Sequence, residues 1–239
     1  IQHTAETLSG VVISQTVNPG TPILYGGSPA IFDIRYETTP MGAIETMMID
    51  CAYNEIGKYF GFPTQAYISL SDAKMLDAQA GVESSFGAVL ASLSGINNIS
   101  GPGMLDFESC QSLEKLILDN EICGMTYRLA KGIEPREDFP SQSIFEELLN
   151  DGHLLIAEHT RKYLKDQIIF PGNIVDRANR SRWIEDGSLT LLQRAVKIKK
   201  EFLGKYKSYD LDDEKRKELI KIMKKSSEFY GQKLPYENY

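Results

Sequence analysis

The stretch from Thr64 to Gly87 constrains the fold of this chain more than any other. It opens with a short apolar and aromatic run at residues 65–70, which is typical of a buried strand, and continues into residues 73–93, where apolar side chains recur at helical spacing. A polar turn separates the two, and in it Ser71 or Asp72 is expected to cap the helix by accepting from its first free N–H groups. The stretch is therefore predicted to be one β-loop-α unit. In a parallel barrel, the carboxyl end of such a strand is where the chemistry lies.

The same alternation of short strands and long helices extends on both sides of this unit. It predicts right-handed crossovers and a parallel sheet, which makes the chain an α/β protein. A sheet of three strands would expose unpaired edges, so further strands are expected from residues upstream of Ile1 or from another copy, and self-association is expected with them. The predicted helices are residues 5–15, 43–59 and 113–130, the last capped by Gln111 or Ser112, and the further strands are residues 23–25 and 96–100.

Beyond the proline-bounded connection at residues 135–140, the strand signals fade. We therefore divide the chain into residues 1–133, the parallel βα units of a partial barrel, and residues 134–239, the final barrel elements and a helical C-terminal extension. Helices are predicted in the second part at residues 143–150, 158–166, 182–206 and 212–230, the last opened by a cap at Asp210 or Asp212.

The charge of the chain is unevenly distributed. Its 26 Lys and Arg against 33 Asp and Glu give a net charge of −7, which argues against a nucleic-acid partner held by phosphate contacts. Residues 194–233, however, contain 13 basic and 7 acidic side chains, a net charge of +6. We interpret this basic tail as a solvated helix face, with a docking surface for an acidic partner as the alternative.

Cysteine usage and hydropathy indicate the compartment. The three cysteines form no Cys-x2-Cys pair, which suits a reducing cytoplasm. No apolar run approaches the length of a membrane span, and residues 1–4 lack the pattern of a signal peptide. We expect a cytoplasmic protein with no membrane partner.

Polar residues near the predicted strand ends are the candidates for substrate binding. Asp72 and Lys74, together with Ser71, follow the central strand, where the alternative interpretation is a helix cap beside a solvated lysine. Tyr25, Asn97 and Asn98 are expected to close the two neighbouring strands and so to face the same end of the sheet.

Two glutamates interrupt apolar helix faces. Glu83 lies beside Ala80 and Gly87, and Glu121 falls on the face defined by Leu113 and Ile117. A carboxylate in such a place must be paired, protonated or directed into a cavity. Both are therefore substrate-binding candidates, with a boundary residue that reaches solvent, or a buried salt bridge, as the alternative.

Metal binding is not indicated. The three histidines, His3, His153 and His159, show no local metal-ligand spacing, and we interpret them as structural. Neither a phosphate-binding fingerprint nor a Ser-His-Asp elbow is present.

Several motifs taken together, in this order along the chain, resemble the trimethylamine methyltransferase family. They are Asn18–Gly27 (NPGTPILYGG), Ser71–Lys74 (SDAK), Asp77–Glu83 (DAQAGVE), Ile96–Ile99 (INNI), Asp119–Ile122 (DNEI) and Glu158–Arg161 (EHTR), with Asp176, Arg177 and Trp183 beyond them.

The resemblance implies a fold and a reaction. The family folds as TIM-type (β/α)8 barrels in chains about twice this length, so the chain resembles the C-terminal half of such a barrel with additional C-terminal helices. Members move a methyl group from a methylamine or betaine to the cobalt of a corrinoid protein. No cofactor is then bound directly, because a partner protein supplies the corrinoid (cobalamin). Aromatic faces and a carboxylate would hold the quaternary or methylated amine.

One departure bears on the substrate. The family's methanogen trimethylamine enzymes carry pyrrolysine, which the resemblance implies in the loop at residues 71–76, but this chain has Ser-Asp-Ala-Lys-Met-Leu there. Either it belongs to a non-pyrrolysine branch with betaine-like substrates, or the residue was replaced or truncated. The alternative functions are a catalytically incomplete half-barrel fragment, a quaternary-amine binding module, and a metal-dependent barrel enzyme.

Overall fold

The computed structural model describes residues 1–134, 136, 141–207 and 211–233. Residues 1–201 form one compact unit and residues 202–239 a second. The predicted boundary after residue 133 lies within the first unit, shortly after the end of helix α4 (Leu113–Lys131), and it stays a prediction. The predicted connection at 135–140 and the alternative cap at Asp210 fall on residues outside the described ones, apart from Arg136.

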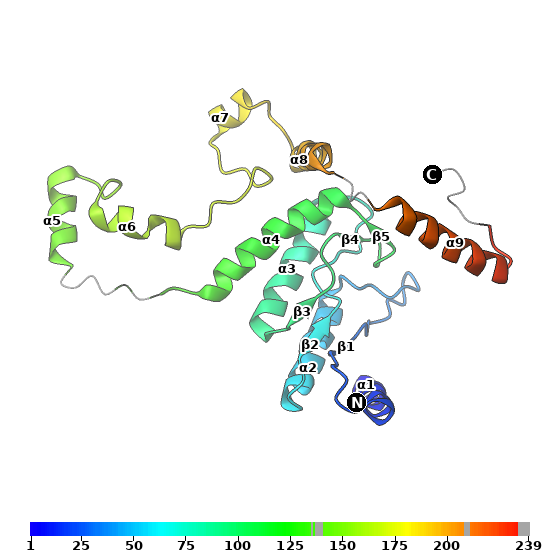
Figure 1. Cartoon of the computed structure of the whole chain (residues 1–239). Coiled ribbons are helices and arrows are strands. Elements are labelled where there is room, and N and C mark those ends of the chain that lie inside the picture. The colour runs from blue at the N-terminus through cyan, green and yellow to red at the C-terminus, as the bar shows by residue number, and fades with distance from the viewer. Residues whose placement is uncertain (135, 137–140, 208–210, 234–239) are drawn as a thin grey trace. The chain divides into compact units, whose positions relative to one another are not determined.

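A small parallel sheet organises the first unit (Figure 1). Its strands are β1 (Tyr25–Gly27), β2 (Thr64–Ala66) and β3 (Asn98–Ile99), in the order β1-β2-β3. Both pairs are parallel, with Tyr25 opposite Thr64 and Gln65 opposite Asn98. The predicted α/β class and parallel sheet are confirmed. The described residues contain no closed barrel, so the half-barrel stays a prediction.

The helices between the strands follow the predicted rhythm. They are α1 (Gln2–Val17), α2 (Ile44–Tyr59), α3 (Ala78–Ser94) and α4 (Leu113–Lys131). Ser112 caps α4 as predicted, because its side chain accepts a 3.2 Å hydrogen bond from the Lys115 N–H. Figure 1 shows α3 and α4 side by side, and they are the most closely packed pair of helices.

The start of α3 differs from the prediction. The helix begins at Ala78, not Ala73, and its cap is Asp77, whose carboxylate accepts from the Ala80 N–H at 3.2 Å. Ser71 and Asp72 do not cap it, because their side chains bond to other parts of the chain. The strand is also shorter than predicted, so residues 67–77 form a long connection at the carboxyl end of β2.

The two faces of the sheet have opposite character. Tyr25, Ala66 and Ile68 pack with α2 and α3 in the main apolar core, whose other buried members are Met47, Tyr53, Ala91 and Ile96. The opposite face is polar: Gln65 Nε2 donates to Ser100 Oγ at 3.0 Å, and Asn98 lies opposite Gln65 in the register. Helices therefore seal one face of the sheet and leave the other to polar side chains.

Helix α2 approaches the sheet closely at Gly57. A Cβ atom there would lie 2.6 Å from Tyr25 Cδ1 and 2.7 Å from Thr64 Cγ2. Only glycine therefore lets α2 lie at this distance from β1 and β2.

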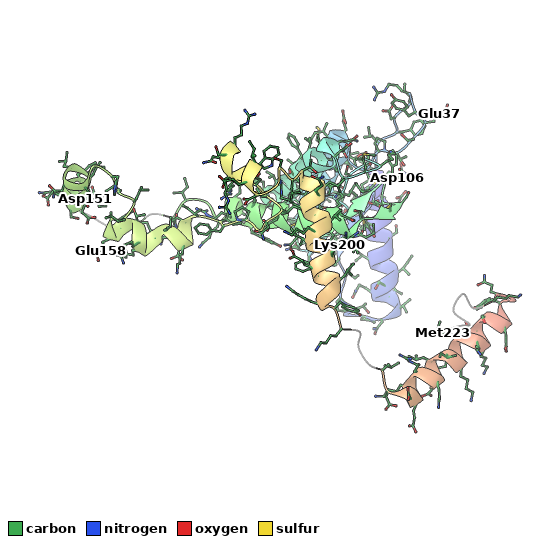
Figure 2. The ribbon with its side chains drawn as sticks, turned by 90° about the horizontal axis from the view of Figure 1, so that it is seen from above. Glu37, Asp106, Asp151, Glu158, Lys200 and Met223 are labelled. Carbon is green, nitrogen blue, oxygen red and sulfur yellow. The ribbon has the colours of Figure 1, made fainter. Side chains whose placement is uncertain are left out.

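A hairpin that the sequence patterns did not predict follows β3. Strands β4 (Met104–Leu105) and β5 (Cys110–Gln111) pair antiparallel around the 106–108 bend. The three residues of the bend, Asp106, Phe107 and Glu108, have φ of 50°, 54° and 71°. Such left-handed values are uncommon outside glycine, so the bend is held by contacts beyond its own backbone preference. Asp106 marks it in Figure 2.

The remaining helices lie beyond α4. They are α5 (Gln142–Asp151), α6 (Glu158–Gln167), α7 (Arg180–Glu185), α8 (Leu191–Lys205) and, in the second unit, α9 (Asp213–Phe229). The continuous helix predicted for residues 182–206 was wrong, because left-handed residues Gly187 (φ 97°) and Ser188 (φ 54°) end α7 before α8 begins. Asp212 caps α9, as one of the two predicted alternatives. Among the described residues, no helix combines the length and hydropathy needed to cross a membrane.

Candidate functional site

The turn after β2, here called the 69–74 turn, is fixed by Glu83 of α3. Glu83 Oε2 accepts hydrogen bonds from Ser71 Oγ at 2.5 Å and from the Asp72 N–H at 2.8 Å, while Oε1 accepts from Gln79 Nε2 at 2.8 Å. Ser69 begins the turn with φ of 69° and donates its hydroxyl to the Ser84 carbonyl at 3.0 Å. The turn is therefore a hydrogen-bonded and largely buried structure at the carboxyl end of β2.

Asp72 connects this turn to the start of α2. Its Oδ1 accepts from the Met41 N–H at 3.0 Å and its Oδ2 from the Gly42 N–H at 2.9 Å. Burial raises the pKa of Asp72 and the charge of Glu83 raises it further, while the two amide donors oppose the shift. A Cβ atom on Gly42 would lie 2.8 Å from Glu83 Oε2, so the two carboxylates and the chain before α2 are closely packed.

Lys74 places its ammonium group in a small cation site, which we call the Phe107 site. Lys74 Nζ lies 4.1 Å from the centroid of the Phe107 ring, 2.8 Å from the Asp72 carbonyl oxygen and 3.5 Å from Asp106 Oδ1. The side chain of Lys74 is 63% exposed. An aromatic face, a carboxylate and a carbonyl oxygen together form an environment that stabilises a positive charge next to solvent.

Two further carboxyl groups, those of Asp50 and Glu108, interact electrostatically with each other or with Asp72 in this region. Asp50 of α2 is 1% exposed, and burial, reinforced by the charge of Glu108, raises its pKa to about 8 against the opposing hydrogen bond of Tyr53. Burial also raises the pKa of Glu108, and the charge of Asp72 adds to that shift. In the described part of the chain, Asp50 Oδ2 and Glu108 Oε1 are buried without a hydrogen-bond partner. The region is thus rich in carboxyl groups, and the raised pKa of Asp50 favours its protonated form.

A buried ion pair lies between α3 and α4. Lys115 Nζ donates to Asp119 Oδ2 at 2.5 Å and to Ser84 Oγ at 2.8 Å, and the Gly103 N–H donates to the same Asp119 oxygen at 2.6 Å. Both charged side chains are 0% exposed. Burial lowers the pKa of Lys115 and raises that of Asp119, and their mutual attraction opposes both shifts.

The structure brings four of the eight predicted site residues together. Ser71, Asp72, Lys74 and Glu83 lie in or against the 69–74 turn. The interpretation of Ser71 or Asp72 as the cap of α3 was wrong, because Asp77 caps it. The alternative of a solvated Lys74 is met in part, since its side chain is 63% exposed while its ammonium group also contacts Phe107 and Asp106. Their binding of a substrate stays a prediction.

Tyr25, Asn97 and Asn98 lie elsewhere than expected. Tyr25 and Asn98 open their strands and do not close them, so they belong to the amino end of the sheet. Tyr25 is fully buried in the core, and Asn97 Oδ1 accepts from the Thr64 N–H at 2.9 Å. Strand β1 begins two residues later than predicted, and β3 keeps only residues 98–99 of the predicted 96–100, so these side chains do not close their strands.

Glu121 serves a different segment. Its Oε2 accepts a hydrogen bond from the Gly172 N–H, and the carboxylate thereby holds the chain before α7 against α4. We predicted that a carboxylate at this position is paired, protonated or directed into a cavity. Glu121 is paired, with the backbone N–H of Gly172. The contacts of Glu121 do not include the 69–74 turn.

Four residues of the region were not predicted from the sequence. Asp119 occurs in the sequence analysis only as part of a family motif, and no sequence pattern marks Asp50, Glu108 or Lys115 as a candidate site residue. A signal was present in α4, where the buried residues Lys115, Leu118, Asp119 and Ile122 recur at helical spacing. From sequence alone, charged residues at such positions are predicted to be exposed to solvent, because the sequence does not show that this helix face is buried. In the described residues, no group of three or more His, Cys, Asp or Glu side chains is arranged to hold a metal ion.

The geometry defines a class of protein. An acidic, hydrogen-bonded turn lies at the carboxyl end of the parallel strands with a cation site beside it, and this end of an α/β fold is where ligands bind. Residues 1–230 match the family described as trimethylamine methyltransferase (MTTB). The chain belongs to the trimethylamine methyltransferase family.

Individual relatives agree with this assignment. The chain is 34% identical, over 88% of its length and 44% of the relative's, to a glycine betaine methyltransferase of Desulfitobacterium hafniense (strain Y51). It is 31% identical to the trimethylamine methyltransferase MttB of Methanosarcina barkeri (strain Fusaro / DSM 804), over 96% of the chain and 46% of the relative. A third relative, MttB of Methanosarcina thermophila, is 33% identical over 80% of the chain and 39% of its own length. The chain spans about half the length of the curated relatives it matches.

Proposed function

We propose that this chain is part of a cytoplasmic methyltransferase that moves a methyl group from a quaternary or tertiary amine to the cobalt of a corrinoid protein. Family membership and the activities named for the relatives support methyl transfer from betaines or trimethylamine. The three parallel strands with one helix-covered and one polar face support a further proposal, that the chain forms about half of a TIM-type barrel. The three free cysteines are consistent with a reducing compartment.

The observation that carries the proposal is the Phe107 site. An ammonium group already lies there, that of Lys74, between an aromatic face and a carboxylate. A quaternary ammonium group has no N–H to donate, so an aromatic face and nearby negative charge are the means by which a protein binds it. The same site is therefore suited to the substrate's methylated nitrogen, once Lys74 swings out toward solvent.

The reaction needs the protein to hold the amine, and it needs no nucleophilic side chain. In methyl transfer, one C–N bond breaks, its electron pair stays on the nitrogen, and the methyl carbon passes to the acceptor. The corrinoid of the partner protein, when bound, would supply the electron pair for the new bond from its cobalt(I). The residues of this chain would bind the cation at Phe107 and Asp106 and fix its direction, which raises the rate by orientation.

A betaine-like substrate is favoured over trimethylamine. The 69–74 turn and the residues after it read Ser-Asp-Ala-Lys-Met-Leu over positions 71–76, where the family resemblance implies pyrrolysine in the trimethylamine branch. The glycine betaine methyltransferase shares 34% identity with this chain. We therefore assign a quaternary amine with a carboxylate, such as glycine betaine, as the first substrate to test.

The direct experiment mixes the whole protein with cob(I)alamin and a panel of betaines, with trimethylamine as the comparison. We expect the methylcobalamin spectrum to develop with at least one betaine and not with trimethylamine. Development with trimethylamine alone would reverse the assignment of substrate. No methyl transfer from any of the amines would overturn the proposed function.

A second candidate function is a quaternary-amine binding module without turnover. It is favoured by the Phe107 site, whose aromatic ring and neighbouring carboxylate are suited to a cationic amine without any further chemistry. Calorimetry with the same betaines separates the two functions. Binding without formation of methylcobalamin supports the module, and turnover excludes it.

A further inference from the structure

The buried ion pair of Lys115 and Asp119 has no evident explanation in stability alone. Two charges that are 0% exposed pay a large desolvation penalty, and well-packed apolar residues of similar volume are often at least as stable. Yet the pair is fully built, with Ser84 accepting from the ammonium and the Gly103 N–H donating to the carboxylate. A second oxygen, Asp119 Oδ1, is buried without a hydrogen-bond partner among the described residues.

Two sets of hydrogen bonds connect this ion pair to the 69–74 turn. On the α3 side, Ser84 follows Glu83, its carbonyl accepts from Ser69 Oγ at 3.0 Å, and the negative charge of Glu83 acts on Lys115. On the other side, Asp119 holds Gly103, and the carbonyl oxygen of the next residue accepts from the Ser71 N–H at 3.1 Å. The ion pair therefore contacts both of the segments that hold the turn.

The 69–74 turn and the 106–108 bend need such support. Ser69 and all three residues of the bend have left-handed backbone conformations that their side chains disfavour. The Asp106 N–H donates to the Ala73 carbonyl at 3.0 Å, so the turn and the bend are joined. Movement of the turn would therefore move the Phe107 site.

We propose that Lys115 is a positioning residue of the methyl-transfer site, which acts with Asp119 through Ser84 and Gly103 to hold the 69–74 turn and thereby the Phe107 site. The inference rests on the proposed function for its consequence in catalysis. Lys115 touches no substrate, since it is completely buried.

The test replaces the pair as a whole, K115M/D119L, so that no unpaired charge is left in the interior. Hydrogen exchange of residues 69–74, followed by mass spectrometry, is the first measurement. We expect exchange of these amides to rise about tenfold or more, while the amides in the middle of α2 keep their protection. Unchanged exchange at residues 69–74 would overturn the proposal, whether or not the protein transfers methyl groups.

A matched control is Lys199→Met, which removes the lysine that pairs with Glu114 on the other side of α4. It is expected to leave exchange at residues 69–74 unchanged. If the double variant fails to fold, Ser84→Ala is measured in its place, because it removes only the hydroxyl that accepts from Lys115. A rise of about threefold is then expected, and no rise counts against the proposal.

A coupling experiment asks whether Ser84 transmits part of the effect. In a Ser84→Ala background, K115M/D119L is expected to raise the exchange of the turn by a smaller factor than in the wild-type background, because the contact of Lys115 with α3 is already lost. An equal rise in both backgrounds would overturn the route through Ser84. In the methyl-transfer assay, the double variant is expected to lower kcat about tenfold with a smaller change in KM, as misplacement of a bound substrate does. A change in KM alone would instead show that the pair affects binding and not orientation.

Discussion

Glu83 Oε2 accepts a 2.5 Å hydrogen bond from Ser71 Oγ, across 12 residues of sequence, and so joins α3 to the connection that precedes it. The same oxygen accepts from the Asp72 N–H. A single carboxylate oxygen thus determines the path of the turn on which the candidate site is built. Predictions about this turn follow from that bond, and others from the burial of particular groups in the sheet and helices around it.

Ser71→Ala is expected to lower the free energy of unfolding by about 1.5–3 kcal/mol, because it removes a buried hydrogen bond to a carboxylate. Chemical denaturation at pH 7 is the measurement. The control is Ser9→Ala on α1, whose exposed hydroxyl bonds only to the Ala5 carbonyl one turn earlier. That change should stay within about 0.5 kcal/mol. Equal effects of the two substitutions would show that the bond to Glu83 contributes nothing special.

The raised pKa of Asp50 predicts that the free energy of unfolding depends on pH. Its pKa is raised to about 8 in the folded protein, chiefly by burial, and lies near 4 in the unfolded chain. The folded protein therefore binds the proton more tightly, so the contribution of Asp50 is fully present below about pH 4 and is lost as the pH rises toward about 8. Asp50→Asn keeps the shape and cannot ionise. Compared with this variant, the wild type should lose up to about 1.4 kcal/mol per pH unit across that window.

Thermal or denaturant unfolding of both proteins from pH 4 to pH 9 measures the difference. The two curves should diverge as the pH rises, with the variant more stable at pH 9. Parallel curves would mean that Asp50 ionises in the folded protein as it does in water.

Gly57→Ala is expected to destabilise the protein by about 1–3 kcal/mol, because the new methyl group would overlap the ring of Tyr25 and the methyl group of Thr64. Gly81→Ala is the matched control, since a Cβ atom there meets nothing within 4 Å on α3. Helix propensity should then stabilise that variant by about 0.5–1 kcal/mol. Opposite signs in denaturation experiments are the expected result, and the same sign for both would contradict the packing of α2 on the sheet.

Lys74→Met should strengthen the binding of a betaine by about threefold to tenfold, because the competing ammonium group leaves the Phe107 site. Phe107→Leu keeps an apolar side chain of similar size and should weaken binding by a comparable factor. Isothermal titration calorimetry measures the dissociation constant of glycine betaine for both variants. Binding that is weakened by Lys74→Met would show that the lysine takes part in holding the substrate.

Much of the fold could be predicted from periodicity. The helices at α2 and α4, the Ser112 cap and the parallel sheet follow from apolar spacing and local capping, which act within a few residues. The start of α3 could not be predicted in this way. Ser71, Asp72 and Asp77 are all good caps, and the choice among them depends on bonds from Asp72 to residues 30 and 31 positions earlier.

In the candidate site, too, the features set by neighbouring residues could be predicted, and the features set by distant contacts could not. The turn that carries Ser71, Asp72 and Lys74 was predicted from its position after a strand, because that relation is local. The hairpin at 104–111 has no turn signature that predicts it, and its bend is held by the contacts of Lys74 and Ala73. Lys115 and Asp119 were overlooked because a charged side chain is normally solvated, and only the packing of α3 on α4 shows that these two are not.

The bonds from Asp72 to Met41 and Gly42 have a consequence for engineering. They tie a turn that follows β2 to a segment that precedes α2, so two stretches far apart in the sequence form one structural module. The donors are main-chain N–H groups, so a graft of residues 69–83 from a relative with another substrate keeps these bonds only if residues 41–42 follow the same path and leave the space that Gly42 leaves beside Glu83. Exchange of specificity within the family is therefore expected to require both stretches from the same donor.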